Sequence, residues 1–299
     1  MTSSEKFTLL TGTGCFLCPR MCGVDRKETP GFCGVSGDKI RINKVMIHRW
    51  EEPCISGKGG AGAVFFSGCN LRCVYCQNYD LSHKVSGTDY SVAELADIFR
   101  DLEARGADNI DLVTPTHYAD KIAAALDIFR PGIPVIWNSS GYERTETLRL
   151  LEGYVDVYLP DMKYISPEKA LRYSAAEDYF DTAAHALAEM CRQTGPALYD
   201  ENGMIKKGTL VRHLVLPGAT GQSVRLLKWL SGHLPEGVPV SIMGQYTPAG
   251  ELTDFPELQR KLTREEYRRV TRAAENLGLT DGYIQSLSSS SEEFIPEFN

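Results

Sequence analysis

The chain has 299 residues, of which 42% are hydrophobic and 24% charged, and its formal net charge is −7. This composition is ordinary for a soluble globular protein with one large domain, or with one domain plus a small one. The negative charge and the lack of a long basic run argue against a nucleic-acid partner. No apolar run approaches the roughly 20 residues that span a membrane, and residues 1–10 do not form a signal peptide, so we expect a cytoplasmic protein without a membrane partner.

Eight of the nine cysteines precede residue 77. Without a signal peptide, cysteines at such short spacings are better explained as metal ligands than as disulfides. The first group contains four cysteines, and four thiolates close a site, which fits either zinc or a fully ligated [4Fe–4S] cluster. The members of this group are Cys15, Cys18, Cys22 and Cys33. We expect residues 1–58 to form a small metal-binding segment that the metal helps to fold.

The stretch between the two cysteine groups is less informative. Residues 39–45 alternate charged and apolar side chains and are predicted to form a strand. Glu51 and Glu52 fit either a solvated edge or the mouth of an active site. We interpret Cys54 as a loop cysteine packed near a cluster, and Cys191 as a small buried hydrophobic residue.

The second cysteine group is the sequence SGCNLRCVYCQN at residues 67–78, with Cys69, Cys73 and Cys76. Three thiolates leave one iron of a four-iron cluster open, and an open coordination position marks a catalytic site. The loop follows the apolar run AVFF, which is typical of a buried parallel strand. Parallel α/β folds place their chemistry after the carboxyl ends of such strands. A structural zinc site or a redox-thiol loop is the alternative.

The rest of the chain alternates helical and strand patterns. Capping boxes at Ser91 with Glu94 and at Thr263 with Glu266 mark two helix starts. Right-handed crossovers between six strands predict a parallel sheet. We therefore expect a core at residues 59–255 and a C-terminal helix with a tail at 256–299. The six strands are expected within residues 63–66, 109–113, 134–138, 155–159, 209–216 and 239–243.

Polar residues follow the predicted strands and should gather beside the cysteine loop if the sheet is parallel. Several of them also have a purely structural interpretation. His117 could cap a helix, Asp161 and Lys163 could form a solvated ion pair, and His213 could be a core histidine. The strand-end candidates are Thr114, Thr116, His117, Asn138, Ser140, Asp161, Lys163, His213 and Gln245.

The pattern Cys69-x-x-x-Cys73-x-Tyr75-Cys76 resembles the signature loop of radical S-adenosylmethionine (SAM) enzymes. Gln77 and Asn78, which follow, resemble the pyruvate formate-lyase activating-enzyme branch of that superfamily. The resemblance implies a partial (β/α)6 barrel and a [4Fe–4S] cluster whose open iron binds the amino and carboxylate groups of SAM. It also implies reductive cleavage of SAM to methionine and a 5′-deoxyadenosyl radical, which abstracts hydrogen from a substrate.

The resemblance assigns roles to several residues. It places Tyr75 near the adenine and Lys163 at the SAM carboxylate, and it gives Asp161 a part in binding a monovalent cation. Asn138 stands where the family has an aspartate, which weakens the cation assignment. Thr-Pro-Thr-His at 114–117 replaces a Gly-Gly-Glu run that holds the SAM amino group, and Gln245 falls near a family histidine that contacts SAM.

The resemblance also implies a substrate, a glycyl radical enzyme that is activated by hydrogen abstraction, and an electron donor of the flavodoxin or ferredoxin type. Relatives with extra clusters insert a ferredoxin-like domain after the signature loop, but residues 77–108 contain no cysteine. The N-terminal cysteines resemble those of an iron–sulfur subgroup, which favours a second cluster over zinc. Modification of another protein, a peptide or a small molecule is the second expectation, and a non-enzymatic iron–sulfur electron carrier is the third.

Overall fold

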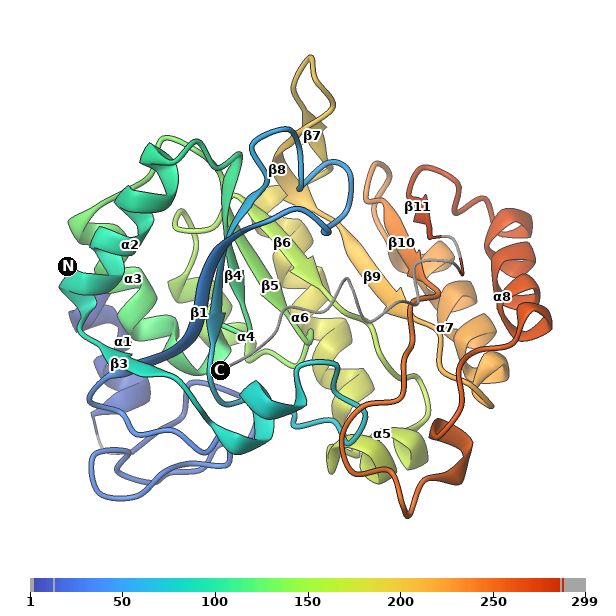
Figure 1. Ribbon diagram of the computed structural model, residues 1–299, viewed down its shortest axis with the longest axis horizontal. Coiled ribbons are helices and arrows are strands. Elements are labelled where there is room, and N and C mark those ends of the chain that lie inside the picture. The colour runs from blue at the N-terminus through green and yellow to red at the C-terminus, as the bar shows by residue number, and fades with distance from the viewer. Residues whose placement is uncertain (1–2, 13, 286, 288–299) are drawn as a thin grey trace.

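The computed structural model describes residues 3–12, 14–285 and 287, and a twisted, mostly parallel sheet runs through its centre (Figure 1). Residues 288–299, which belong to the expected C-terminal tail, lie outside the described residues. The boundaries expected at residues 58 and 255 stay predictions. None of the helices in the described ranges is long and apolar enough to cross a bilayer.

The central sheet contains the predicted parallel strands, and every residue of the first four is buried. Such runs are apolar on both faces because helices cover one face and the interior of the barrel lies against the other. In spatial order they are β2 (Ala61–Phe66), β4 (Asn109–Val113), β5 (Val135–Ser139), β6 (Val157–Pro160) and β8 (Ile205–Thr209). Antiparallel strands flank them: β1 (Ile40–His48) and β3 (Thr88–Tyr90) at one edge, and β7 (Leu198–Tyr199) at the other.

A second sheet continues the first around the barrel. After Leu210, β8 passes into β9 (Val211–Leu214), which pairs in parallel with β10 (Val240–Met243). The backbone N–H of Met162, just after β6, donates a 2.7 Å hydrogen bond to the carbonyl oxygen of Arg212 in β9. The six predicted strands therefore form the expected partial barrel. A further short strand, β11 (Tyr283–Ile284), pairs in parallel with β10.

Both predicted capping boxes are present. Ser91 with Glu94 starts α2 (Val92–Ala104), and Thr263 with Glu266 starts α8 (Arg264–Asn276), each with both reciprocal hydrogen bonds. The long helix expected from about residue 176 begins at Tyr179. The other helices are α1 (Ser3–Thr11), α3 (Ala119–Ile128), α4 (Thr145–Leu150), α5 (Pro167–Ser174), α6 (Tyr179–Thr194) and α7 (Thr220–His233).

Helices α1 to α3 form a group toward one end of the sheet and α7 and α8 form a second group toward the other, with α4 to α6 between them (Figure 1). Phe66, Phe99 and Trp137 belong to the core beneath the first group. Leu227 and Ile242 belong to the core beneath the second. Each helix thus buries one apolar stripe against the sheet, as amphipathic helices do.

The loop at residues 49–60 fills the inside of the barrel at the amino ends of the strands. Ile55 accepts a 2.8 Å hydrogen bond on its carbonyl oxygen from the side chain of Asn109, the first residue of β4. The carbonyl oxygen of Cys54 accepts one of 2.9 Å from Ile205, the first residue of β8. Both loop side chains pack in a cluster with Leu159. The amino end of the barrel is therefore filled with apolar side chains, and the carboxyl end is left for a site.

Candidate functional site

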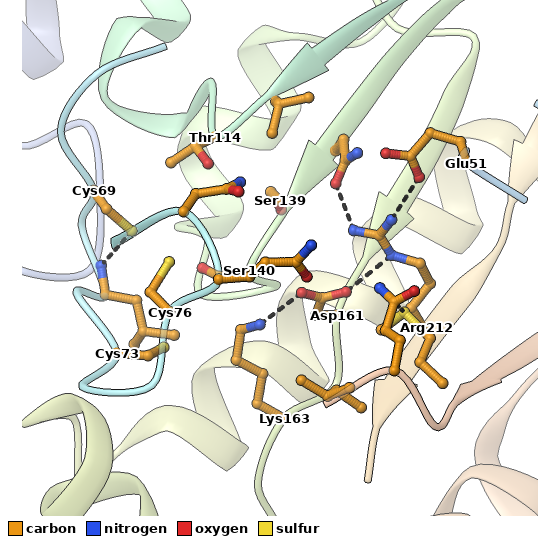
Figure 2. Close-up of a pocket in the computed structure, with 18 of the residues that line it drawn as sticks. Glu51, Cys69, Cys73, Cys76, Thr114, Ser139, Ser140, Asp161, Lys163 and Arg212 are labelled. Carbon is orange, nitrogen blue, oxygen red and sulfur yellow. Dashed lines mark hydrogen bonds and ion pairs between the residues drawn. The ribbon is translucent and has the colours of Figure 1, made fainter. Parts of the chain in front are cut away.

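A pocket opens at the carboxyl ends of the parallel strands. Cys69, Cys73 and Cys76 line one end of it, and Glu51 and Arg212 line the other. Figure 2 shows the cysteines gathered on one side, with Asp161 and Lys163 between them and the Glu51–Arg212 pair. Strand-end residues and the cysteine loop therefore lie together, and thiols, cations and carboxylates share one cavity.

The loop that carries the cysteines directs backbone N–H groups at sulfur. The N–H groups of Leu71 and Arg72 point at the Sγ atom of Cys69 at 3.3 and 3.4 Å. Arg72 has a φ of 51°, in the left-handed region, which gives the loop its tight turn. Hydrogen bonds to sulfur favour the thiolate, the form that ligates iron. Burial acts in the opposite direction and raises the pKa of Cys69 to about 11 and that of Cys76 to about 12.

These opposing influences test whether a cluster fits the loop. Thiols with such raised pKa values are protonated at neutral pH unless a positively charged centre stabilises their thiolates. Three sulfurs that face one cavity, with N–H donors aimed at one of them, are a donor set that suits an iron–sulfur cluster. Within the described ranges, no three or more His, Cys, Asp or Glu side chains are already arranged at the spacing of a metal site.

A chain of hydroxyl groups leads to the middle cysteine. The hydroxyls of Tyr75 and Tyr164 lie 2.8 Å apart, and that of Tyr164 lies 2.8 Å from Ser174 Oγ. Ser174 in turn donates a 3.1 Å hydrogen bond to the Sγ atom of Cys73. Tyr75 also packs edge-on against the ring of Tyr246. The wall of the pocket beside the cysteines is therefore aromatic, with polar tips held in fixed positions.

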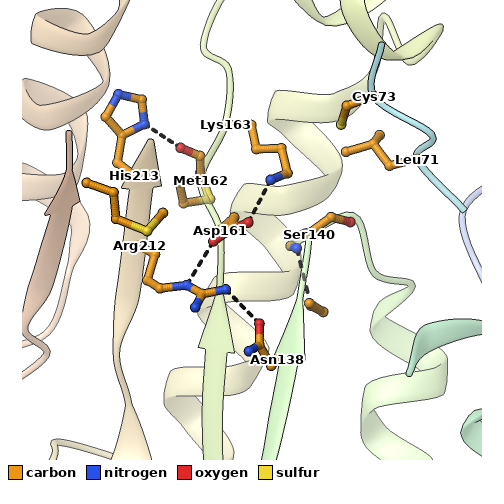
Figure 3. A network of polar contacts seen from close by, with 12 residues as sticks. Leu71, Cys73, Asn138, Ser140, Asp161, Met162, Lys163, Arg212 and His213 are labelled. Atoms are coloured by element: carbon orange, nitrogen blue, oxygen red, sulfur yellow. Dashed lines mark hydrogen bonds and ion pairs between the residues drawn. The ribbon is translucent and has the colours of Figure 1, made fainter. Parts of the chain in front are cut away.

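Arg212 centres a buried charged network (Figure 3). Its guanidinium donates to Asp161 Oδ1 at 3.0 Å, to Glu51 Oε2 at 3.0 Å and to Asn138 Oδ1 at 2.6 Å. Lys163 Nζ donates to the second oxygen of Asp161 at 2.6 Å. Burial alone would raise the pKa of Asp161, but Lys163 and Arg212 outweigh it and hold that pKa below its usual value. Both oxygens of this carboxylate are thus paired with cations.

This network bears on two expectations. The side chains of Asp161 and Lys163 are each 15% exposed, so they are not the solvated pair that we considered. Arg212 lies between Asp161 and Asn138, where the resemblance implies a monovalent cation. The bound monovalent cation stays a prediction, and the guanidinium of Arg212 already supplies a positive charge at that position.

Most predicted SAM contacts line the pocket, and three do not. Thr116 donates its hydroxyl to Glu143 at 2.6 Å, inside the protein. The Nε2 atom of His117 bonds the carbonyl oxygen of Ser67, and the Nδ1 atom of His213 bonds that of Met162. These three side chains support buried backbone and carboxyl groups, and for His213 this matches the core-histidine alternative. Those that line the pocket are Tyr75, Asn78, Thr114, Asn138, Ser140, Asp161, Lys163 and Gln245.

The structure also adds residues to the site. Arg212 of β9 is one of them, and a basic residue within an otherwise apolar strand was its signal in the sequence. Glu51 and Glu52 both line the pocket, which decides between the alternatives left open for them. Cys54 is buried among apolar residues at the amino end of the barrel, and it is not among the residues that line the pocket.

The N-terminal cysteines lie against the cysteine loop. The backbone N–H of Cys69 donates a 3.3 Å hydrogen bond to the carbonyl oxygen of Cys33. A Cβ atom on Gly31 would lie 3.4 Å from the sulfur of Cys22 and 3.8 Å from that of Cys33, so this glycine leaves space beside both. Burial raises the pKa of Cys18, and the nearby cysteines of the same group raise it further. The N-terminal cysteines are therefore near neighbours, although in the described ranges their side chains are not arranged at the spacing of a metal site.

Comparison with known proteins identifies the family. A model described as the Radical SAM superfamily matches residues 63–230. MJ0674, an uncharacterized protein of Methanocaldococcus jannaschii, is 30% identical over 275 residues, which cover 89% of this chain and 75% of that protein. The chain therefore belongs to the radical SAM superfamily. Membership implies an enzyme that uses SAM and a [4Fe–4S] cluster.

Solved structures resemble the fold at low identity. SuiB of Streptococcus suis, bound to its precursor peptide SuiA, is 12% identical with a TM-score of 0.50; the match covers 75% of this chain and 48% of SuiB. Methylornithine synthase, PylB, is 14% identical with a TM-score of 0.47 over 77% of this chain and 71% of that one. This chain spans about half the length of SuiB, and the likeness to SuiB concerns the fold alone.

Proposed function

We propose that this protein cleaves SAM reductively in the pocket described above, with Cys69, Cys73 and Cys76 holding a [4Fe–4S] cluster. The observation that carries the proposal is the shared cavity of the three cysteines with Asp161 and Lys163. When bound, the reduced cluster supplies the electron that splits SAM into methionine and a 5′-deoxyadenosyl radical. The radical then abstracts a hydrogen atom from the substrate.

The residues of the pocket would bind and orient SAM. The ammonium group of Lys163 is held by Asp161 near the cysteines, where it can pair with the carboxylate of SAM. Thr114, with a φ of 61°, turns the chain sharply after β4 and lines the cavity. Tyr75, Asn78, Asn138, Ser140 and Gln245 would supply contacts to the adenine, the ribose and the amino group. The apolar amino end of the barrel excludes water from below, which protects a radical from side reactions.

We infer that the substrate is a glycyl radical enzyme, activated by abstraction of hydrogen from a backbone glycine. The support is the resemblance of the cysteine loop, of Gln77 with Asn78 and of Asp161 with Lys163 to the activating-enzyme branch. A flavodoxin or ferredoxin would deliver the electron in the cytoplasm. This assignment rests on likeness and not on a contact with a substrate.

We infer further that Cys15, Cys18, Cys22 and Cys33 hold a second iron–sulfur cluster, with zinc as the alternative. Four thiolates close a site, so its role would be structural or electron-transferring rather than substrate-binding. The closeness of these sulfurs and the space beside Gly31 support a metal here.

The test is an anaerobic assay of reconstituted protein, with dithionite as reductant and 5′-deoxyadenosine as the product measured. Wild type should form 5′-deoxyadenosine, and Cys73→Ala should form none above background. Cys191→Ala removes a buried cysteine of α6 that is not among the pocket-lining residues, and should retain activity. Iron, sulfide and zinc contents decide the N-terminal metal. A fully loaded wild type that cleaves no SAM, with or without a candidate substrate, would contradict the proposal.

Activation of a glycyl radical enzyme is tested by electron paramagnetic resonance on mixtures with candidate partners. A glycyl doublet that requires SAM and Cys73 would support it. SAM cleavage without a doublet in any mixture would direct attention to another protein, a peptide or a small molecule as the substrate.

A further inference from the structure

The end of the pocket remote from the cysteines combines residues of the family match, such as Arg212, with a segment that precedes the match. Trp50, Glu51 and Glu52 line it, and they precede residue 63, where the match to the superfamily begins. The SAM-cleaving cysteines lie inside the match. A wall that lies outside the shared core, and that faces the same cavity, is where a chain adapts a common reaction to its own substrate.

The charges at this end do not balance. Four buried carboxylates surround the guanidinium of Arg212, and each of them acts on it electrostatically. They are Glu51, Glu52, Asp111 and Asp161. The cations in the network are Arg212 and Lys163, so two of the four carboxylates have no matching positive charge. Burial raises the pKa of Asp111 well above its usual value, so a proton neutralises that carboxylate, and Glu52 is left for a proton or a bound cation.

Hydrogen bonding singles out one of these carboxylates. The donors of Arg212 are taken up by Asp161, Glu51 and Asn138. The nearest Arg212 nitrogen lies 3.8 Å from Glu52, which is too far for a hydrogen bond. Among the described residues, neither side-chain oxygen of Glu52 has a hydrogen-bond partner, although the side chain is 2% exposed. The Ser241 hydroxyl lies near enough to lower the pKa of Glu52 but makes no hydrogen bond of good geometry with it, so this acceptor in the pocket lining still has capacity for a ligand.

We propose that this end of the pocket binds a cationic nitrogen group of the substrate, an ammonium or a guanidinium, with Glu52 as its acceptor. Such a group offers several N–H donors and the positive charge that the network lacks. Burial raises the pKa of Glu52 to about 7, and a cation bound beside it would favour the ionised carboxylate, with the proton released to solvent. The inference deepens the proposed function because it assigns a substrate class to the same pocket.

The position of Glu52 separates this role from SAM binding. Asp161 and Lys163 stand between the cysteines and the Glu51–Arg212 pair (Figure 2). SAM held by the cysteine loop would reach Lys163 first. Glu52 is then left for the molecule that meets SAM from the other side. SAM is itself a cation, so its own affinity must be measured in any test.

The experiment measures cation binding by calorimetry on reconstituted, SAM-loaded protein under anaerobic conditions. The probes are butylguanidinium and butylammonium, with butylurea as the uncharged isostere. Wild type should bind the cations at least about tenfold more tightly than butylurea, as expected for charged hydrogen bonds. Glu52→Gln should lose this preference. Glu143→Gln is the matched control, because Glu143 is also buried with a pKa raised to about 7 but is not among the pocket-lining residues.

A second pair of probes separates the sources of the cation. A blocked Gly-Arg-Gly tripeptide and its citrulline analogue differ only in the charge of the guanidinium. Preference for the arginine peptide would indicate a protein side chain, and binding of the free cations alone would indicate a small molecule. Equal affinities of wild type and Glu52→Gln for the cations would overturn the proposal.

Two further measurements keep the result clear. Loss of SAM affinity in Glu52→Gln would overturn the proposal by assigning Glu52 to SAM. If Glu52→Gln does not fold, Glu52→Asp is the second variant, because it keeps the negative charge but moves the carboxylate back from the cavity by one methylene. Cations should then bind more weakly but still more tightly than the uncharged probe. Loss of this preference would count against the proposal. Cation binding does not require SAM cleavage, so failure of the proposed function would appear separately, as absent 5′-deoxyadenosine with intact cation binding.

Discussion

The backbone N–H of Cys69, the first cysteine of the pocket loop, donates a 3.3 Å hydrogen bond to the carbonyl oxygen of Cys33, the last cysteine of the N-terminal group. A Cβ atom on the intervening Gly68 would lie 2.6 Å from that oxygen, so a glycine is needed for the approach. Arg20 strengthens the contact by donating to the carbonyl oxygens of Asn70 and Ser174. The N-terminal segment therefore forms part of the wall that positions the pocket loop.

This contact predicts that damage to the N-terminal cysteines reaches the pocket. Cys33→Ala should lower the metal content, lower the thermal midpoint by roughly 5 °C, and reduce SAM cleavage, because a metal-supported segment no longer braces Cys69. Elemental analysis, thermal unfolding and 5′-deoxyadenosine formation measure the three effects. Cys54→Ala is the control, and its metal content should equal that of wild type. Equal metal contents in Cys33→Ala and Cys54→Ala would show that the N-terminal group binds no metal.

Ser174 should influence the redox properties of the pocket. Its hydroxyl donates to the sulfur of Cys73, and hydrogen bonds to ligand sulfur stabilise the more electron-rich, reduced state of a cluster. Ser174→Ala should lower the reduction potential by on the order of tens of millivolts. A titration monitored by electron paramagnetic resonance measures the shift. Ser223→Ala, which removes a buried hydroxyl bonded to Ala219, should leave the potential unchanged. Identical potentials in the two variants would contradict the assignment.

Arg212 should be essential for stability as well as for the site. Its side chain is 12% exposed and is surrounded by acidic groups. Arg212→Met would leave these carboxylates without their common cation, and should lower the free energy of unfolding by about 3–5 kcal/mol. Arg212→Lys keeps the charge, but a single ammonium nitrogen cannot span the separate positions of the three acceptors as the planar guanidinium does, so an intermediate loss is expected. Urea unfolding measures both. A neutral Arg212→Met result would mean that the carboxylates are protonated in the folded protein.

Glu143 should make stability depend on pH. Burial raises its pKa from the usual 4.5 to about 7. Hydrogen bonds from the hydroxyl of Thr116 and the indole N–H of Trp137 lower the pKa but do not cancel the effect of burial. Between these two values the unfolded chain loses a proton that the folded chain keeps. Stability contributed by this group is therefore full below about pH 4.5 and is lost as the pH rises to about 7.

The variant Glu143→Gln isolates this contribution. Its free energy of unfolding should fall less steeply with pH than that of wild type, by at most about 1.4 kcal/mol per pH unit. Urea unfolding at intervals from pH 5 to pH 7.5 gives both curves, and the difference between them removes the contribution of Glu52. Parallel curves would mean that Glu143 is ionised in the folded protein throughout this range.

Much of the fold could be predicted because its signals are local. Apolar runs marked the six parallel strands, and the two capping boxes marked α2 and α8. The short strands β3, β7 and β11 contain two or three residues each, too few to show a period. Helix α5 was missed although Ser166 caps it and Pro167 occupies its first turn, which was a usable signal.

The site was harder to predict because side-chain direction depends on backbone turns. Thr114 lies in the left-handed region, and after this turn Thr116 and His117 are buried and bond inside the protein. Glu51 and Glu52 would face opposite ways on an extended chain, but the carbonyl oxygen of Glu52 accepts from two later N–H groups in a turn. Both glutamates line the pocket because of it. Packing inside the barrel determines the path of this loop, and a local sequence pattern cannot predict such long-range packing.

The charged network also constrains the order in which the chain can mature. Glu51, Asp111 and Asp161 are synthesised before Arg212, which follows Asp161 by 51 residues. Until β9 leaves the ribosome, the first sheet carries these carboxylates without the guanidinium that joins them. Stable closure of the barrel must therefore wait for the second sheet, whereas both cysteine groups emerge within the first 76 residues. During synthesis the cysteine side chains thus emerge well before the pocket around them is complete.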